Sequence, residues 1–381
     1  MAVTVSWDGL RELAAFRAVN GCAISLYVDL DPSVTPTAGD LASRVNARVD
    51  EGMREISEPR DNLSHSQRRA LREDIERIGA YFVQEFSREG ARGVAVFAAG
   101  LDNVWKPITL IESVPDDVKI GREFYLAPLV PLVGRGDGAL VAVVGRERGS
   151  LYRLQAGRLQ ELVDRTEEQP LRRSDQGGWS QARYQRHVDH LTGGHLRRVA
   201  DELDRHVRRL RSPRVVIVSS EDTKAELDDL LSNPTKDALA GWAQAEAHAS
   251  APELLPVVTP VLERWRSQQE ERVAERWQEE RGRNGRAAAG WQETLEAASD
   301  GRVETLLFHE VAEHPACQCP RCGRASVTGG NCPLDGVRME PEANGLDIAV
   351  HQTLRHGGTV WALRTRRDLD PFEGIGALLR Y

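Results

Sequence analysis

The stretch ALVAVVGRERGSLYRLQAGRLQELV, which runs from Ala139 to Val163, decides the fold of the middle of the chain. An apolar run is followed by a turn between Arg146 and Gly149, a second strand pattern and another turn at Gly157. Strand-like runs separated by short, glycine-containing turns predict an antiparallel meander.

The residues that follow the meander add helices to these strands. A helical pattern runs from about Ser180 to Arg211, and the apolar run RVVIVSS predicts a further strand. Ser220 is a suitable N-cap for the pattern EDTKAELDDLL, whose first-turn acidic residues are favoured by the helix dipole. The order strand, strand, helix, strand, helix is typical of an α/β domain.

The regions on either side predict two further segments of mixed structure. Toward the N-terminus, strand patterns such as CAISLYVDLDP alternate with amphipathic helix patterns, and a glycine-rich linker from Gly134 to Gly138 ends this segment. Toward the C-terminus, a helix pattern from about Pro252 to Arg281 leads into alternating helices and strands. We therefore predict an α/β (α+β) chain of three domains, with an N-terminal domain 1–135, a middle domain 136–250 and a C-terminal domain 251–381.

Composition excludes several classes of protein. The 381 residues are 40% hydrophobic and 28% charged, which is typical of a globular rather than a disordered chain. The net charge of −8 argues against a protein that coats nucleic acid through bulk electrostatics. The segment 171–214 is different, because its eleven arginines outnumber its five acidic residues. A basic middle segment in an acidic chain predicts that only this part contacts nucleic acid.

Neither a membrane span nor a signal peptide is predicted. No window of about 18 apolar residues exists, and the N-terminus carries Asp8 and Glu12 where a signal peptide needs a basic start and an apolar run. We expect a cytoplasmic protein that acts as a monomer.

Four of the five cysteines lie in the sequence HPACQCPRCGRASVTGGNCPLDG, residues 314–336. It contains the pair Cys319 and Cys322, with two residues between them, and the matching pair Cys332 and Asp335. Two such turns separated by a hairpin-length spacer are typical of a zinc ribbon, because each turn directs two ligands toward one point and zinc takes four. We therefore predict a structural zinc-binding insertion over 314–336.

The identity of the fourth zinc ligand stays open at the level of sequence. A zinc ribbon usually has a fourth cysteine, and Asp335 stands in its place. Carboxylate is an acceptable zinc ligand, although Cys317 or His314 could serve instead. The alternative to metal binding is a redox-inert remnant of a zinc knuckle.

A second motif, DQGGWSQARYQRH, precedes the basic helix pattern. Adjacent glycines at Gly177 and Gly178 mark a turn or a backbone that must approach another molecule closely. Ser180 is an N-cap candidate, so the glycines could simply turn the chain into the helix. The chain has no GxGxxG or Walker pattern, no GxSxG elbow and no HExxH motif, which argues against a nucleotide-binding loop or a metabolic active site of these kinds.

The motif GGWSQARYQR resembles the GGQ loop of the archaeo-eukaryotic peptide-chain release factors, which reads GGQSAxRFxR. The three-part layout, the cysteine-bearing insertion in the third part and the terminus GIGALLR resemble the bacterial branch of that superfamily, which is related to peptidyl-tRNA hydrolases. The resemblance covers most of the chain but is specific only in the loop and its helix. It implies a tRNA-shaped protein whose middle domain is ribonuclease-H-like.

The same resemblance implies a role at the ribosomal peptidyl-transferase centre. In the family, a glutamine helps to position a water molecule against the ester that joins peptide to tRNA. By this analogy Gly177 and Gly178 permit close approach to the tRNA, and Arg183 and Arg186 contact rRNA phosphates. The implied partners are the ribosome, through its rRNA and peptidyl-tRNA, and a translational GTPase.

This chain departs from the family pattern at the glutamine itself. Trp179 occupies that position, and Gln181 follows two residues later. Relatives that release stalled peptidyl-tRNA also carry a displaced glutamine, so Gln181 is the candidate catalytic residue, while the indole of Trp179 could stack on a base. No NIKS-like decoding motif occurs between Met1 and Val133, which disfavours stop-codon termination. Two hypotheses remain: a peptidyl-tRNA hydrolase of ribosome rescue or quality control, and a non-catalytic ribosome-binding factor of hibernation or stress.

Overall fold

The computed structural model divides the chain into two compact units, residues 135–268 and residues 1–134 together with 269–381. For 155, 163 and 181–192 only the backbone is described. The described residues are 5, 7–57, 63–88, 90–133, 138–146, 148–155, 158–163, 181–210, 214–245, 249–283, 285–309, 312, 314–342 and 344–381. In these ranges, no helix is long and apolar enough to cross a membrane.

The unit 135–268 is built on a five-stranded sheet with the order β7-β6-β5-β8-β9. The predicted meander is confirmed, because β5, β6 and β7 pair antiparallel in sequence order. Strands β8 and β9 extend the sheet in parallel from β5. The strand bounds are β5 Leu140–Val144, β6 Gly149–Gln155, β7 Arg158–Val163, β8 Val215–Ser219 and β9 Leu239–Ala243.

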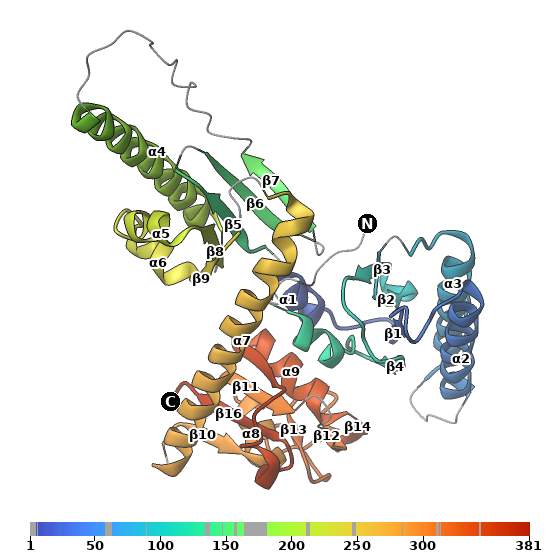
Figure 1. Cartoon of the computed structure of the whole chain (residues 1–381). Coiled ribbons are helices and arrows are strands. Elements are labelled where there is room, and N and C mark those ends of the chain that lie inside the picture. Colours follow the sequence, from blue (N-terminus) through green and yellow to red (C-terminus); the bar gives the residue numbers. More distant parts are fainter. Residues whose placement is uncertain are drawn as a thin grey trace. The chain divides into compact units, whose positions relative to one another are not determined.

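Helices cover both faces of this sheet (Figure 1). On one face, α4 (Gln181–Arg209), α5 (Glu221–Asp228) and α6 (Asn233–Ala238) share a hydrophobic cluster with β5 and β8. On the other face, the first turns of α7 (Ala251–Gly282) pack through residues such as Val258 against the alternate side chains of the same strands. Ser220 caps α5, as predicted, by accepting a hydrogen bond from the backbone N–H of Thr223.

The other unit combines the N-terminal and C-terminal regions of the sequence. Its first sheet is antiparallel, with the order β3-β2-β1-β4. One face of this sheet packs against the long helices α2 and α3, which lie side by side (Figure 1). Its elements are α1 Trp7–Ala15, β1 Ala23–Asp29, α2 Ala38–Ser57, α3 His65–Gln84, β2 Gly93–Ala99, β3 Val104–Leu110 and β4 Asp117–Gly121, followed by the 3₁₀ turn η2 Ala127–Leu132.

The C-terminal region contributes a second sheet, with the order β10-β16-β11-β15, and a small three-stranded sheet, β13-β12-β14. Only the β11–β15 pair is parallel within the described ladders of the larger sheet. The elements are β10 Ala287–Ala289, α8 Gly290–Ser299, β11 Val303–His309, β12 Ala316–Gln318, β13 Ala325–Ser326, β14 Glu340–Glu342, α9 Gly345–Arg355, β15 Thr359–Leu363 and β16 Ile375–Leu379.

The two regions share one hydrophobic core. Tyr27 and Phe97, on the face of the first sheet opposite α2 and α3, belong to the same buried cluster as Trp291 of α8 and Ala349 of α9. All four side chains are buried. The first and third segments of the sequence therefore lie in one compact unit. The mixed helix and sheet content confirms the predicted α/β (α+β) class.

The predicted long helix is confirmed as α7, and Glu270 anchors its second half. The buried Oε1 atom of Glu270 accepts hydrogen bonds from the backbone N–H groups of Arg364, Thr365 and Arg366, at 2.8, 2.9 and 3.2 Å. Successive N–H groups that converge on one carboxylate form an anion-binding concavity. This contact ties α7 to the segment that follows β15.

Replacing Glu270 with alanine is expected to lower the free energy of unfolding by about 2 kcal/mol, because three backbone N–H groups lose their shared carboxylate acceptor. Urea denaturation of the full chain measures this change. The matched control is Glu271→Ala, since Glu271 is exposed and lies 3.9 Å from its ion-pair partner Arg366. Exposed pairs of this kind contribute little. Equal denaturation midpoints for the two variants would contradict the anchoring role.

Candidate functional site

The glycine motif leads directly into helix α4. Gly177, Gly178, Trp179 and Ser180 lie outside the described residues, so their predicted roles stay predictions. The described backbone begins with Gln181 as the first residue of α4. Arg183 and Arg186, the predicted phosphate contacts, lie in the first two turns of the same helix. Residues three apart share a helix face, so the geometry is compatible with a joint contact.

The C-terminal half of α4 is fixed to the sheet. Leu196 and Leu203 are buried in the cluster that this helix shares with β5 and β8. The helix passes very close to β6, because a Cβ atom added at Gly149 would lie 2.8 Å from a methyl group of Val199. A larger residue at Gly149 would therefore push α4 away from the sheet. The helix that begins at Gln181 is thus held by a rigid base.

A carboxylate joins α4 to the following helices. Asp204 accepts hydrogen bonds from Arg208 at 2.5 Å, from the hydroxyl of Ser232 and from the hydroxyl of Thr235 at 3.3 Å. The Arg208 guanidinium, followed by the Ser232 hydroxyl, lowers the pKa of Asp204 below its ordinary value. Ser232 is also the N-cap of α6, so this network connects the α4 and α6 termini.

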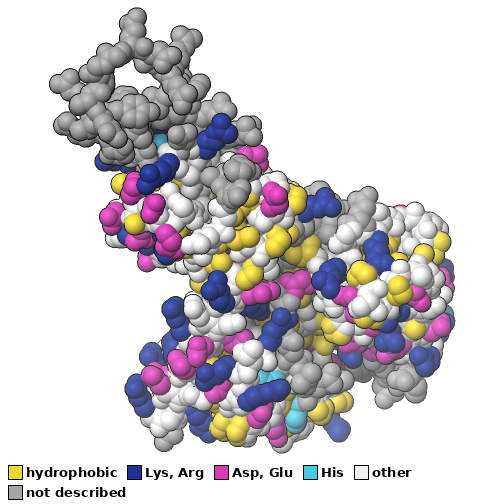
Figure 2. Space-filling model, viewed as in Figure 1, with side chains coloured by type: hydrophobic (Ala, Val, Ile, Leu, Met, Phe, Trp, Pro, Cys, Tyr) yellow, Lys and Arg dark blue, Asp and Glu magenta, His cyan; other side chains and the backbone are white. Residues whose placement is uncertain are grey.

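Part of the basic excess of α4 is neutralised on its own surface. Glu202 pairs with Arg205 and lies 3.2 Å from His206, while Asp204 pairs with Arg208. On the face seen in Figure 2, basic and acidic side chains are interspersed over the described surface. The described half of α4 therefore presents a mixed surface, and the predicted nucleic-acid contact rests on the residues nearer its N-terminus.

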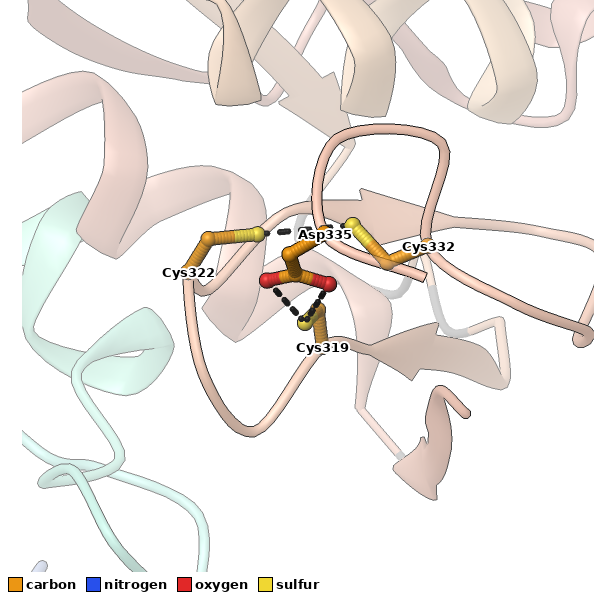
Figure 3. A group of neighbouring side chains, drawn as sticks. All are labelled: Cys319, Cys322, Cys332 and Asp335. Carbon is orange, nitrogen blue, oxygen red and sulfur yellow. Dashed lines mark hydrogen bonds between the residues drawn. The ribbon is translucent and has the colours of Figure 1, made fainter. Parts of the chain in front are cut away.

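The predicted metal ligands come together in the insertion of the C-terminal region. The ligand atoms of Cys319, Cys322, Cys332 and Asp335 all lie within 4.8 Å of one another. Figure 3 shows Cys319 and Cys322 on one turn, facing Cys332 and Asp335 on another. The Cys322 and Cys332 sulfurs are 3.5 Å apart, and the Cys319 sulfur lies 3.4 and 3.5 Å from the two carboxylate oxygens of Asp335.

These separations fit a tetrahedral ion. With metal–sulfur bonds of about 2.3 Å and metal–oxygen bonds of about 2.1 Å, a tetrahedron requires sulfur–sulfur separations of about 3.8 Å and sulfur–oxygen separations of about 3.6 Å. The backbone N–H of Val337 lowers the pKa of Asp335, so this carboxylate is held in the ionised form that binds a cation. The group of four could therefore hold a metal.

Two equivalent turns place the ligands. In the first, the N–H of Gly323 donates to the carbonyl of Cys319 at 2.9 Å; in the second, the N–H of Gly336 donates to the carbonyl of Cys332 at 2.9 Å. Both glycines have positive φ, 78° and 72°, a conformation that other residues adopt only with strain. The CxxC-G and CxxD-G patterns therefore fold alike, with Asp335 in the position of the missing cysteine.

The structure separates the three candidates for the fourth ligand. Cys317 lies on β12 opposite Ser326, and the described metal-ligand group does not include it. The His314 ring stacks on Trp291 with a centroid separation of 5.2 Å, and its Nδ1 atom lies 2.6 Å from the Pro315 carbonyl. Among the three, Asp335 is the one that joins the cysteines.

The turn that carries Cys319 and Cys322 is hydrogen-bonded to helices of the shared core. The carbonyl of Gly323 accepts a hydrogen bond from the side chain of Gln352 on α9 at 2.9 Å. The N–H of Ala325 donates to the hydroxyl of Ser299 at the end of α8 at 2.9 Å. A metal held here would therefore fix a loop against α8 and α9, which is a structural rather than a catalytic arrangement.

Sequence reasoning missed a buried charged group that joins the two regions of the same unit. His351 of α9 lies between two carbonyl groups, with Nε2 at 2.5 Å from Phe124 and Nδ1 at 3.2 Å from Ala14. Its ring nitrogens lie 3.6 Å from Asp347 and 3.8 Å from Glu123. The available signal was the pair Asp347 and His351, four residues apart in an otherwise apolar helix pattern.

The geometry requires a protonated imidazole. Both ring nitrogens of His351 face carbonyl oxygens, which only accept, so both nitrogens must donate and the ring must carry two protons. Burial alone would lower the pKa of His351, but Asp347, Glu123 and the two carbonyls raise it above its ordinary value. Burial raises the pKa of Asp347 to about 6, although His351 and the Leu126 N–H oppose this shift.

Comparison with known proteins finds a family that is similar to the middle of the chain. Residues 125–263 match the model of "Bacterial archaeo-eukaryotic release factor family 10". An uncharacterized protein of Mycobacterium tuberculosis is 28% identical over 309 residues, which cover 77% of this chain and 79% of the relative.

Two solved structures are similar at a lower level. Archaeal Pelota, in a ribosome-bound model, aligns with 100% of this chain and 95% of its own, at 13% identity and a TM-score of 0.42. Dom34 of S. cerevisiae, described as a translation termination-like factor, aligns with 76% of this chain and 80% of its own, at 11% identity and a TM-score of 0.41.

Proposed function

We propose that this chain, whose middle matches a bacterial archaeo-eukaryotic release factor family, is a ribosome-associated, release-factor-like protein. The observation that carries this proposal is the family match over residues 125–263, which contains the glycine motif and α4. The excess of arginines over 171–214 supports it, because rRNA and tRNA present phosphates to any protein that enters the ribosome.

The activity proposed for this site is hydrolysis of the peptidyl-tRNA ester in ribosome rescue or quality control. Gly177 and Gly178 allow the backbone to approach the tRNA 3′ end, and Gln181 orients the attacking water through its uncharged amide. Trp179 stacks on a base, while Arg183 and Arg186 contact phosphates. The ribosome's RNA supplies the rest of the catalytic environment. The packing of the C-terminal half of α4 against the sheet supports this role, because it joins the helix that begins at Gln181 to the middle unit.

Substitution of Gln181 with alanine is expected to slow peptide release about a hundredfold, because water positioning and proton transfer contribute on this scale. The measurement is release of labelled peptide from stalled ribosome complexes. Gln185→Ala is the matched control, since Gln185 lies one turn further along α4 and the family resemblance gives it no role. Equal release by the wild type and Gln181→Ala would remove Gln181 from the mechanism.

A second function is favoured by one observation, that Trp179 stands where the family's glutamine stands. On this reading the chain occupies the ribosome without chemistry, as a hibernation or stress factor, and the loop serves only in binding. Absence of release by both the wild type and Gln181→Ala, together with co-sedimentation with ribosomes, would favour this function. Failure to co-sediment even at low salt, where phosphate contacts are strongest, would contradict both functions.

The proposal also includes a bound metal ion and a protein partner. The metal of the insertion is zinc, because three thiolates and one carboxylate in tetrahedral positions match its preferences and Cys319 and Cys332 are buried. A bound zinc would link the two turns through its four ligands. The protein partner is a translational GTPase that delivers the chain to the ribosome; it is proposed on the family resemblance, and co-purification with the chain tests it.

A further inference from the structure

The topology of the unit 135–268 opens a crevice at one end of its sheet. Strands β8 and β9 are parallel neighbours. The connection that leaves β8 enters α5, on the same face as α4, whereas the connection that leaves β9 leads to α7 on the opposite face. Where adjacent parallel strands send their helices to opposite faces, the two connections diverge beyond the carboxyl ends of the strands. Ligand sites of open α/β sheets occur at such points.

A cavity of about 300 Å³ lies at this position. Its walls include Ser219 from the end of β8, Trp242 and Gln244 from the end of β9, Lys224 from α5 and Arg264 from α7. The volume falls at the lower end of the range for small-molecule sites. All of the lining residues come from one compact unit.

Two cations reach the cavity from opposite walls. Arg264 is exposed, and its Nε–H donates a hydrogen bond to the Pro260 carbonyl at 3.3 Å. Its terminal guanidinium nitrogens form no ion pair with a carboxylate of the described residues. The Nζ atom of Lys224 lies 3.6 Å from Glu221 and 5.9 Å from the centre of the Trp242 ring. Glu221 is also bonded to the Gln244 amide at 2.8 Å. The positive charge of Arg264 is therefore the one left uncompensated in this wall.

The wall of the cavity includes Ser219, whose buried hydroxyl is unsatisfied. Ser219 is 4% exposed, and its Oγ atom has no hydrogen-bond partner within the described part of the chain. A buried hydroxyl without a partner costs free energy, so such groups usually bond to water or a ligand. The site thus combines an unpaired guanidinium, an ammonium and an indole ring, with the Ser219 hydroxyl behind them in the wall.

We propose that this cavity binds a nucleoside monophosphate group, with the phosphate between Arg264 and Lys224 and the base against Trp242. Planar guanidinium and ammonium groups are the usual phosphate ligands of proteins, and every base has a face that stacks on an aromatic ring. The group could be a free mononucleotide or a nucleotide of single-stranded RNA, which share this chemistry. The inference is independent of the proposed function on the ribosome.

Isothermal titration calorimetry of the full chain, without ribosomes, tests the proposal. AMP, GMP, CMP and UMP are titrated alongside adenosine, inorganic phosphate and a short single-stranded oligonucleotide. We expect saturable binding at one site by at least one monophosphate, with adenosine and phosphate each at least about tenfold weaker. Tighter binding of the oligonucleotide would assign the group to RNA, and tighter binding of the mononucleotide would assign it to a free ligand.

Substitutions of the lining residues test whether the nucleotide binds in this cavity. Arg264→Gln and Lys224→Gln should each weaken binding at least about tenfold, whereas Arg272→Gln, an exposed arginine two turns further along α7, should leave it unchanged. Trp242→Leu should weaken binding and Trp242→Phe should retain it, with circular dichroism to verify folding. Absence of binding by all four monophosphates at millimolar concentration would overturn the proposal, as would equal affinities of Arg264→Gln and Arg272→Gln. Phosphate that binds as tightly as AMP would overturn the nucleoside part.

Discussion

Replacing Cys319 with serine is expected to reduce the zinc content of the purified chain from about one ion to nearly none, and to unfold the insertion. Cys319 is fully buried, and its sulfur faces the Asp335 carboxylate across the ligand group. Structural zinc sites contribute about 10–16 kcal/mol of apparent binding free energy in small zinc-finger peptides, so the two turns should lose their structure when the ion leaves.

The damage should stay within the insertion. The core shared by α8, α9 and the two larger sheets of this unit contains no cysteine, and most of its residues lie outside the insertion. Metal analysis measures the loss of zinc, and limited proteolysis measures the new accessibility of residues 314–336. A chelator added to the wild type should reproduce the same cleavage pattern. Wild-type protein without stoichiometric zinc would contradict the assignment of the ion.

Two further variants make this test specific. Cys317→Ser is the matched control, because Cys317 belongs to the same insertion but lies outside the ligand group, and it should retain zinc. Asp335→Cys should retain zinc and resist chelators better than the wild type, because it completes a set of four thiolates in the same turn geometry. Asp335→Ala should bind zinc more weakly. Zinc loss from Cys317→Ser but not from Asp335→Ala would show that the fourth ligand was wrongly assigned.

Local features of this chain were predictable from sequence. The meander, the Ser220 cap, the long helix α7 and the two ligand turns all depend on residues within a few positions of one another. Spacing and turn chemistry encode such features directly. The Asp335 carboxylate could be placed in the ligand group for the same reason, because the glycine that follows it repeats the turn of Cys319 and Cys322.

Long-range features were not predictable. The core shared by the first and third segments depends on residues such as Tyr27 and Ala349 entering one buried cluster, and each looks like an ordinary buried residue of its own element. The crevice beside Trp242 depends on which face of the sheet each connection takes, and hydrophobic periodicity carries no such information. The burial of Asp347 and His351 was likewise hidden, because a pair at this spacing on a helix is usually exposed to solvent.

Substituting His351 with leucine should lower the free energy of unfolding of the full chain by about 3–5 kcal/mol, because the variant leaves the partly buried carboxylate of Asp347 without its cationic partner. It also removes both donors from the carbonyls of Phe124 and Ala14, which belong to the N-terminal region. For a unit of this size the thermal midpoint should fall by about 10 °C. Thermal unfolding followed by circular dichroism measures the shift. His65→Gln is the control, since His65 is exposed in the same unit.

The cost of losing the imidazolium should also depend on pH. His351 has a raised pKa in the folded chain, so its stabilisation is fully present below the unfolded value of about 6.5 and disappears as pH rises through the folded pKa. Ionisation of Asp347, with its pKa of about 6, weakens the folded state in the same direction between about pH 4 and 6. Urea denaturation should therefore show a larger cost of His351→Gln at pH 6 than at pH 9. An equal cost at both values would mean that His351 is neutral in the folded chain, and that one of its two carbonyl contacts lacks a proton.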